Sequence, residues 1–212
     1  MGHNIVVTQT RANVSGEDLV VPDGQWDIMA YTLHGNTQML LFDQPLQGPV
    51  KVPVVAGQQQ LIISFHAGSY IAKVPRSKRG VHFLLVQNNQ TFQLADRTFP
   101  IPTFDTVEDF TKALIESNIL VQDRVVTQAA HSQKPNASTR TVQRQFRHVT
   151  GMTPHYYAQA VRARQAFFLL QRGEPAITVA HELGYTDQFH MTHALKRFVG
   201  KTPREIKRDT AN

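Results

Sequence analysis

The chain has 212 residues, of which 41% are hydrophobic and 18% charged, so it has the composition of a folded globular protein. It contains no cysteine, which excludes disulfides, thiolate metal sites and cysteine nucleophiles. The net charge of +6 is concentrated in residues 123–212, where fourteen Lys and Arg stand against six Asp and Glu, and such an excess favours a polyanionic partner, nucleic acid first.

No apolar run approaches the roughly 18 to 20 residues that span a bilayer, so no membrane partner is expected. The first residues lack the basic start and the long apolar stretch of a signal peptide. Together with the absence of cysteine, these features predict a cytoplasmic protein.

The first half of the chain is predicted to consist of β-strands. Turn signals separate its short apolar runs, and Gly35-Asn36 is typical of a hairpin connection. Strands with no helical period between them predict a small antiparallel barrel or sandwich over residues 1–104. The expected strands are residues 26–33, 37–42, 60–66 and 80–86.

The pattern changes at Asp105. Residues 105–120 carry an apolar stripe at helical spacing and acidic residues in their first turn, as a helix start prefers. This predicts a helical connector over residues 105–122.

From residue 123 the chain is predicted to be helical. Ser138 is expected to cap the first well-defined helix and Gly151 to end it. The expected helices are residues 138–151, 153–173, 175–184 and 187–200, followed by a short turn of helix from Thr202-Pro203. The apolar stripe of helix 138–151 is expected to be Val142, Phe146 and Val149. Helix 153–173 has Pro154 near its first turn, Gly173 past its end and the apolar residues Tyr157, Val161, Phe168 and Leu169 between them.

Helices 175–184 and 187–200 form a helix-turn-helix pattern. Gly184 allows the tight turn, and Ala180 is small where the two helices must cross. The residues expected to form the core of this pair are Ile177, Val179, Leu183, Met191 and Leu195.

The upstream helix repeats the same scheme. "RHVTGMTP" (147–154) aligns with "KRFVGKTP" (196–203), which also aligns Ser138 with Asp187. The helix between the two copies has about 19 residues and a length of roughly 28 Å. This spacing suits two recognition helices in successive major-groove segments, which lie about 34 Å apart.

On these repeats, and above all on "AITVAHELGYTDQFHMTHALKRFVGKTP" (176–203), residues 124–208 resemble the DNA-binding domain of the AraC/XylS family of bacterial transcription regulators. "VPDGQWDIM" (21–29), "LQGPV" (46–50) and "LIISFHAGSY" (61–70) resemble, more loosely, the small cupin-like sensor domains of some members. One departure is that Pro135 and Asn136 stand where the family usually has an apolar residue and Gly.

The resemblance implies a two-domain α+β protein. A cupin-like sensing or dimerisation domain would occupy residues 1–104, and an all-α double helix-turn-helix domain residues 123–212. The implied function is sequence-specific regulation of transcription, as activator or repressor, and the implied partners are double-stranded DNA, RNA polymerase, a small-molecule effector and a second copy of the chain.

Carried onto this sequence, the resemblance assigns base contacts and phosphate contacts. Arg suits guanine, Gln suits adenine and an apolar side chain suits a thymine methyl, although Phe189 also fits a core position. Arg162 is expected to be structural. The implied base contacts are Arg140, Gln143, Arg144, Gln188, Phe189, His190 and His193, and the implied phosphate contacts are Thr139, Arg147, Lys196, Arg197 and Lys201.

The competing interpretations are a metal site and an enzyme. His190 and His193 lack a further ligand at suitable spacing, and His34, His66 and His82 fall in different predicted strands. We therefore expect no metal, no cofactor and no catalytic residue. The alternative function is a cupin-type enzyme with a structural helical tail.

Overall fold

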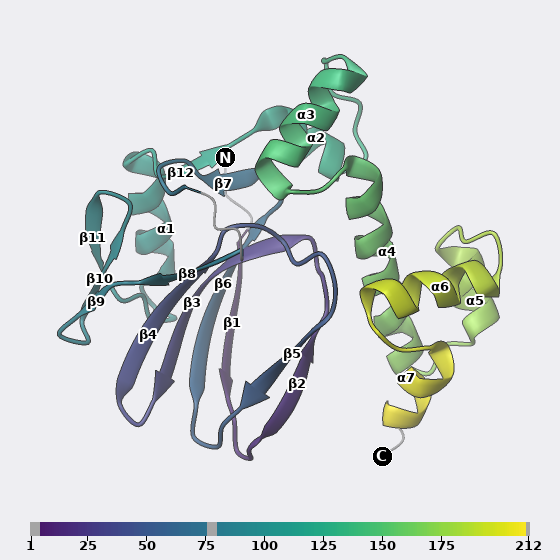
Figure 1. Cartoon of the computed structure of the whole chain (residues 1–212), viewed down its shortest axis with the longest axis horizontal. Coiled ribbons are helices and arrows are strands. Elements are labelled where there is room, and N and C mark those ends of the chain that lie inside the picture. The colour runs from purple at the N-terminus through teal and green to yellow at the C-terminus, as the bar shows by residue number, and fades with distance from the viewer. Residues whose placement is uncertain (1–4, 76–79, 211–212) are drawn as a thin grey trace. The chain divides into compact units, whose positions relative to one another are not determined.

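A computed structural model of the chain describes residues 5–75 and 80–210. By their internal contacts these residues form two compact units. The first holds the large sheet and helices α1–α3, and the second holds helices α4–α7 together with residues 19–24 and 46–52 (Figure 1).

The first unit is built on a five-stranded sheet in the order β1-β6-β3-β4-β8. Its strand pairs are antiparallel, as predicted. The smaller sheets are β11-β10-β9, β12-β7 and β2-β5. The strands are β1 Ile5–Arg11, β2 Gly16–Val20, β3 Gln25–Leu33, β4 Asn36–Phe42, β5 Val50–Val54, β6 Gln59–His66, β7 Ser69–Ile71, β8 Val81–Leu84, β9 Val86–Gln87, β10 Thr91–Leu94, β11 Arg97–Pro100 and β12 Leu120–Gln122.

The central strand β3 follows the alternation of a sheet with one buried face. Trp26, Ile28 and Ala30 are buried, while the residues between them are partly exposed. The Trp26 ring stacks on Phe65 of β6, with ring centroids 4.3 Å apart, and its indole N–H donates to the Ser69 carbonyl at 2.7 Å. The β3–β6 register is thereby fixed by packing on the buried face.

The described strands do not form the closed barrel that was one of the expected architectures. β1 and β8 lie at opposite edges of the five-stranded sheet, and no pairing joins them among residues 5–75 and 80–210. The other described strands pair in three smaller sheets, and the sheets stay open (Figure 1).

The hairpin between β3 and β4 is present, but its turn differs by one residue from the predicted one. Leu33 pairs with Asn36, so the two turn residues are His34 and Gly35. Both have positive φ, 49° and 77°, as a primed two-residue turn requires. Asn36 is therefore the first residue of the next strand.

The predicted connector helix is shorter than residues 105–120. α1 spans Val107–Glu116 and places Val107, Phe110 and Leu114 in the core of the first unit. Asn118 then takes a positive φ of 53°, which ends the helical path, and residues 120–122 pair with β7 as β12.

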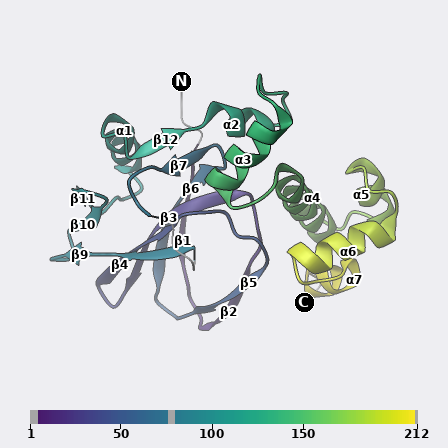
Figure 2. The same cartoon turned by 45° about the horizontal axis from the view of Figure 1, so that its top comes forward.

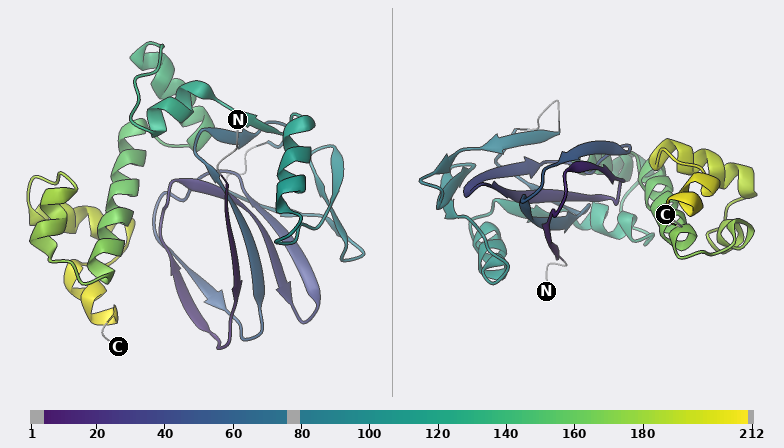
Figure 3. Two further views of the ribbon diagram at one scale, coloured as in Figure 1. Left: turned by 180° about the vertical axis from the view of Figure 1, so that it is seen from behind. Right: turned by 90° about the horizontal axis from the view of Figure 1, so that it is seen from below.

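Among the remaining helices, α3 to α6 match the predicted ones within a few residues, α2 has no separately predicted counterpart, and α7 is longer than the short turn of helix that was expected. They are α2 Arg124–Ala130, α3 Thr139–Thr150, α4 Pro154–Gln171, α5 Ala176–Glu182, α6 Gln188–Phe198 and α7 Pro203–Thr210. In the second unit α5, α6 and α7 all pack against α4 (Figure 3). The core between them includes Leu170, Val179, Met191, Leu195 and Ile206.

The buried face of α4 consists mainly of small residues. Its buried residues are Ala160, Ala163, Ala166 and Leu170, whereas Phe168 is exposed. Small residues at helical spacing let α6 approach α4 closely, and Phe198 of α6 packs on Ala160 and Ala163.

Ile177 was also expected in the core, and that expectation is wrong. Its side chain is 72% exposed in the first turn of α5. Val179 and Ala180 of the same helix are buried in the core of the second unit. Ile177 lies on the opposite, exposed side of α5.

Candidate nucleic-acid interface

The pair α5–α6 has the geometry of a helix-turn-helix. The connection runs over residues 183–187, and Gly184 takes a left-handed φ of 68° in it. Asp187 caps α6 by accepting a hydrogen bond from the His190 N–H at 2.7 Å. Ala180 of α5 and Met191 of α6 are buried in the same core, and the outward face of α6 is exposed.

The pair α2–α3 is a less regular version. The helices pack together, but the connection over residues 131–138 is longer and contains Pro135. This agrees with the departure from the family pattern seen in the sequence. Besides α3, the turn before β7 contacts α2.

That turn holds α2 through its backbone. The Asp123 N–H donates to the Gly68 carbonyl at 2.8 Å, and Gly68 lies against Thr127 of α2. On the neighbouring strand, the ring of Tyr70 meets His148 of α3 edge-on, with centroids 6.3 Å apart. Figure 2 shows α2 and α3 beside β7 and β12.

The two copies that the sequence suggested have the same local structure. Ser138 caps α3 as Asp187 caps α6, and Gly151 and Gly200 follow them with φ of 73° and 75°. Thr153 then caps α4, and Thr202, forty-nine residues later, accepts a hydrogen bond from the Glu205 N–H in the first turn of α7. The helix α4 between the copies has 18 residues, which corresponds to about 27 Å.

All the candidate base-contacting residues are exposed. In α3 these are Arg140, Gln143 and Arg144, opposite the buried Phe146 and Val149. In α6 they are Gln188, Phe189, His190 and His193. Sequence reasoning missed Thr192, the counterpart of Gln143 at the forty-nine-residue spacing of the repeat.

Phe189 settles one of the alternatives left open by the sequence. Its ring is 80% exposed, so it is not a core residue. A large apolar side chain in that position is available to a ligand.

His190 lies on the flank of α6 next to the turn. Its Nδ1 atom is 3.4 Å from the Thr186 hydroxyl, and its ring meets Tyr185 edge-on at 5.4 Å. The guanidinium of Arg162 lies over the Tyr185 ring, 5.5 Å from its centroid. Burial raises the pKa of Tyr185 to about 12, and the charge of Arg162 opposes that rise. Arg162 is thus a structural residue through a cation–π contact.

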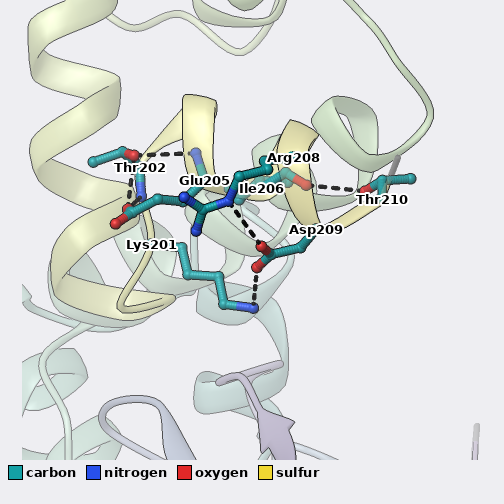
Figure 4. A network of polar contacts seen from close by, with 7 residues as sticks. All are labelled: Lys201, Thr202, Glu205, Ile206, Arg208, Asp209 and Thr210. Carbon is teal, nitrogen blue, oxygen red and sulfur yellow. Dashed lines mark hydrogen bonds and ion pairs between the residues drawn. The ribbon is translucent and has the colours of Figure 1, made fainter. Parts of the chain in front are cut away.

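The candidate phosphate contacts differ in what else they do. Thr139, Arg147 and Lys196 are exposed. The guanidinium of Arg197 lies over the Tyr156 ring, 4.7 Å from its centroid. The Lys201 ammonium is 2.9 Å from Oδ2 of Asp209, so this cation already has an acidic partner (Figure 4).

The same polar network fixes the start of α7. The Thr202 N–H and hydroxyl both donate to Oε2 of Glu205 at 2.7 Å, while the Thr202 hydroxyl oxygen accepts from the Glu205 N–H at 3.3 Å (Figure 4). These hydrogen bonds hold the pKa of the Glu205 carboxyl below its ordinary value. The arrangement is a capping box at the start of α7.

Within the described part of the chain, no group of three or more His, Cys, Asp or Glu side chains is placed to hold a metal ion. His82 instead pairs with Asp43, with Nε2 and Oδ2 3.0 Å apart. None of the helices over residues 5–75 and 80–210 has the length and apolar character needed to cross a membrane.

Comparison with known proteins agrees with this geometry. Residues 132–209 match the family model described as "Helix-turn-helix domain". The HTH-type transcriptional activator RhaS of Escherichia coli, in strains K12 / DH10B and O157:H7, is 34% identical over 71 residues. That match covers 33% of this chain and 26% of RhaS, so the chain spans about a quarter of the length of these relatives.

The C-terminal part of the chain is therefore a helix-turn-helix domain. This segment is similar in sequence to a part of the RhaS activator. A solved structure of ToxT from Vibrio cholerae is 7% identical, with a TM-score of 0.45 over 100% of this chain and 98% of that one.

Proposed function

We propose that this protein is a sequence-specific DNA-binding regulator of transcription that reads two successive major-groove segments with α3 and α6. The observation that carries the proposal is the duplication: two capped helices, each ended by a left-handed glycine and followed by a second capped helix, present exposed polar faces. A cupin-type enzyme with a structural tail would leave this duplicated exposed surface without a role.

The charge of this region supports a polyanionic ligand. Arg140, Arg144 and Arg147 are exposed on α3, and Lys196 and Arg197 on α6. Arg and Gln in the groove supply base specificity, and the cations at the helix ends supply phosphate contacts.

We assign DNA reading to residues 123–212, a sensing or dimerising role to residues 1–104 and coupling between them to residues 105–122. For an effector, the candidate pocket is an apolar hollow of about 430 Å³ between β11 and α1. Its lining includes Phe99, Ile101, Phe110 and Ala113. Contacts with RNA polymerase and with a second copy of the chain complete the proposal.

The test is selection of duplexes from a random library by the purified chain at about 150 mM salt. Two enriched blocks roughly one helical turn apart are expected. Equal binding to selected and scrambled duplexes would overturn the assignment as a specific regulator.

A further inference from the structure

The outward faces of α3 and α6 can be compared position by position. The forty-nine-residue offset that pairs Ser138 with Asp187 also pairs Arg140 with Phe189, Gln143 with Thr192, Arg144 with His193 and Arg147 with Lys196. Because a helix turns about 100° per residue, Phe189, His193 and Lys196 lie within roughly 60° of one another. The buried Met191 and Leu195 face the other way.

The face of α3 is made of hydrogen-bond donors. Arg140, Gln143 and Arg144 are exposed, and none of their side chains forms a hydrogen bond or ion pair with another described residue. Guanidinium groups suit O6 and N7 of guanine, and a carboxamide suits N6 and N7 of adenine.

The face of α6 offers apolar groups at two of the three equivalent positions, and the third is His193. Phe189 replaces Arg140 and is 80% exposed. Thr192 replaces Gln143, and its hydroxyl donates to the Gln188 carbonyl at 2.8 Å. The helix therefore engages the Thr192 hydroxyl, and the group that this side chain offers a ligand is its methyl.

We infer that the two helices read chemically different subsites: α3 a guanine-containing subsite through Arg140 and Arg144, and α6 a thymine-containing subsite through the Phe189 ring and the Thr192 methyl. The inference rests on the proposed function and adds the base chemistry of each half. The DNA site is consequently asymmetric, and the protein binds it in one direction.

Two features of α6 favour DNA over a protein as the partner of Phe189. It occupies the position of Arg140 in the repeat, and Lys196 lies on the same side of α6, where a phosphate contact belongs. If Phe189 contacted a protein partner instead, DNA binding by this chain would not depend on thymine methyl groups. The experiment below distinguishes the two cases.

The experiment uses the full chain and the duplex it selects. Repeating the selection with Gln143→Ala and with His193→Ala assigns one enriched block to each helix. Thymines are then replaced by deoxyuridine, which removes only the C5 methyl, and guanines by 7-deazaguanine, which removes only the N7 acceptor. Dissociation constants are measured for each block separately.

In the α6 block, each contacted thymine changed to deoxyuridine should weaken binding about three- to fourfold, the value of one buried methyl. The Phe189→Ala protein should lose most of this preference for thymine, and adding Thr192→Ser, which removes the second methyl contact, should abolish the rest. 7-Deazaguanine should weaken binding about tenfold in the α3 block only. Ile177→Ala, which also truncates an exposed apolar side chain, should keep the full preference for thymine.

No loss on deoxyuridine substitution, or an equal loss in both blocks, would overturn the inference and leave the proposed function standing. Failure to enrich any duplex would overturn the proposed function itself. Circular dichroism of Phe189→Ala is expected to match the parent protein, because the residue is outside the core.

Discussion

The ammonium of Lys201 lies 2.9 Å from Oδ2 of Asp209, so an ion pair links the last turn of α7 to the segment just before the helix. The hydrogen bond from Lys201 also holds the pKa of the Asp209 carboxyl below its ordinary value. A cation that the sequence assigned to phosphate is thus already neutralised within its own unit, and phosphate must compete with Asp209 for it.

Asp209→Asn should therefore strengthen binding to any duplex by a few fold. One more cation becomes available, so the slope of log K against log salt should steepen by up to about 0.9. Fluorescence anisotropy over a salt series measures both quantities. Adding Lys201→Gln to this variant should cancel the gain, and a gain that survives would show that another group is responsible.

Substitutions at Arg197 and at Lys196 should affect different properties, namely the stability of the fold and the binding of DNA. Arg197→Ala loses the stacking on Tyr156, so the free energy of unfolding should fall by about 0.5–1 kcal/mol. Lys196→Ala should leave unfolding unchanged and flatten the salt slope by about one unit. Urea unfolding and a salt series test the pair, and an equal loss of stability in both variants would contradict the assignment.

Arg144→Ala should weaken the preferred duplex by ~1–3 kcal/mol and affect scrambled duplex less. Arg144→Lys is the matched control, since it keeps the charge but lacks the two-pronged donor. It should restore binding to scrambled duplex only. Equal losses on both duplexes for Arg144→Ala would mean that Arg144 contacts phosphate alone.

Two of the five tyrosines should titrate late in the folded protein. Burial, with a smaller effect of the Asp23 charge, raises the pKa of Tyr157 to about 12, and burial raises the pKa of Tyr185 to about 12. A raised folded-state pKa stabilises the fold below the unfolded pKa of about 10, and this contribution is lost as pH rises from there through 12. Phenolate absorbance should show two equivalents near 12, and Tyr157→Phe and Tyr185→Phe should each remove one.

Gly68→Ala should loosen the first helix pair. A Cβ at position 68 would lie 2.8 Å from the Thr127 Cα, so α2 must shift, at a cost of about 1–3 kcal/mol in unfolding free energy. Thr127→Ala should restore only part of the loss, because the clash includes backbone. Gly16→Ala is the control, since nothing lies within 4 Å of its added Cβ. In duplex selection, the block belonging to α3 should weaken first.

The sequence by itself determined helices α3 to α6 and their ends within a few residues. Ser138, Asp187, Gly151 and Gly200 act on their own backbone neighbours, so their effects can be read without knowing the fold. The same holds for the duplicated motif and for the exposed face of α3, because helical periodicity alone separates Phe146 and Val149 from Arg140 and Arg144.

Only the tertiary structure decided how the elements meet. The open sheets follow from which strands pair, the alanine face of α4 from how closely α6 approaches, and the exposure of Ile177 from the direction in which α5 leaves its turn. The partners of Lys201, Arg197 and Arg162 likewise come from other turns or helices. Such contacts depend on long-range packing, which the local pattern of a sequence does not encode.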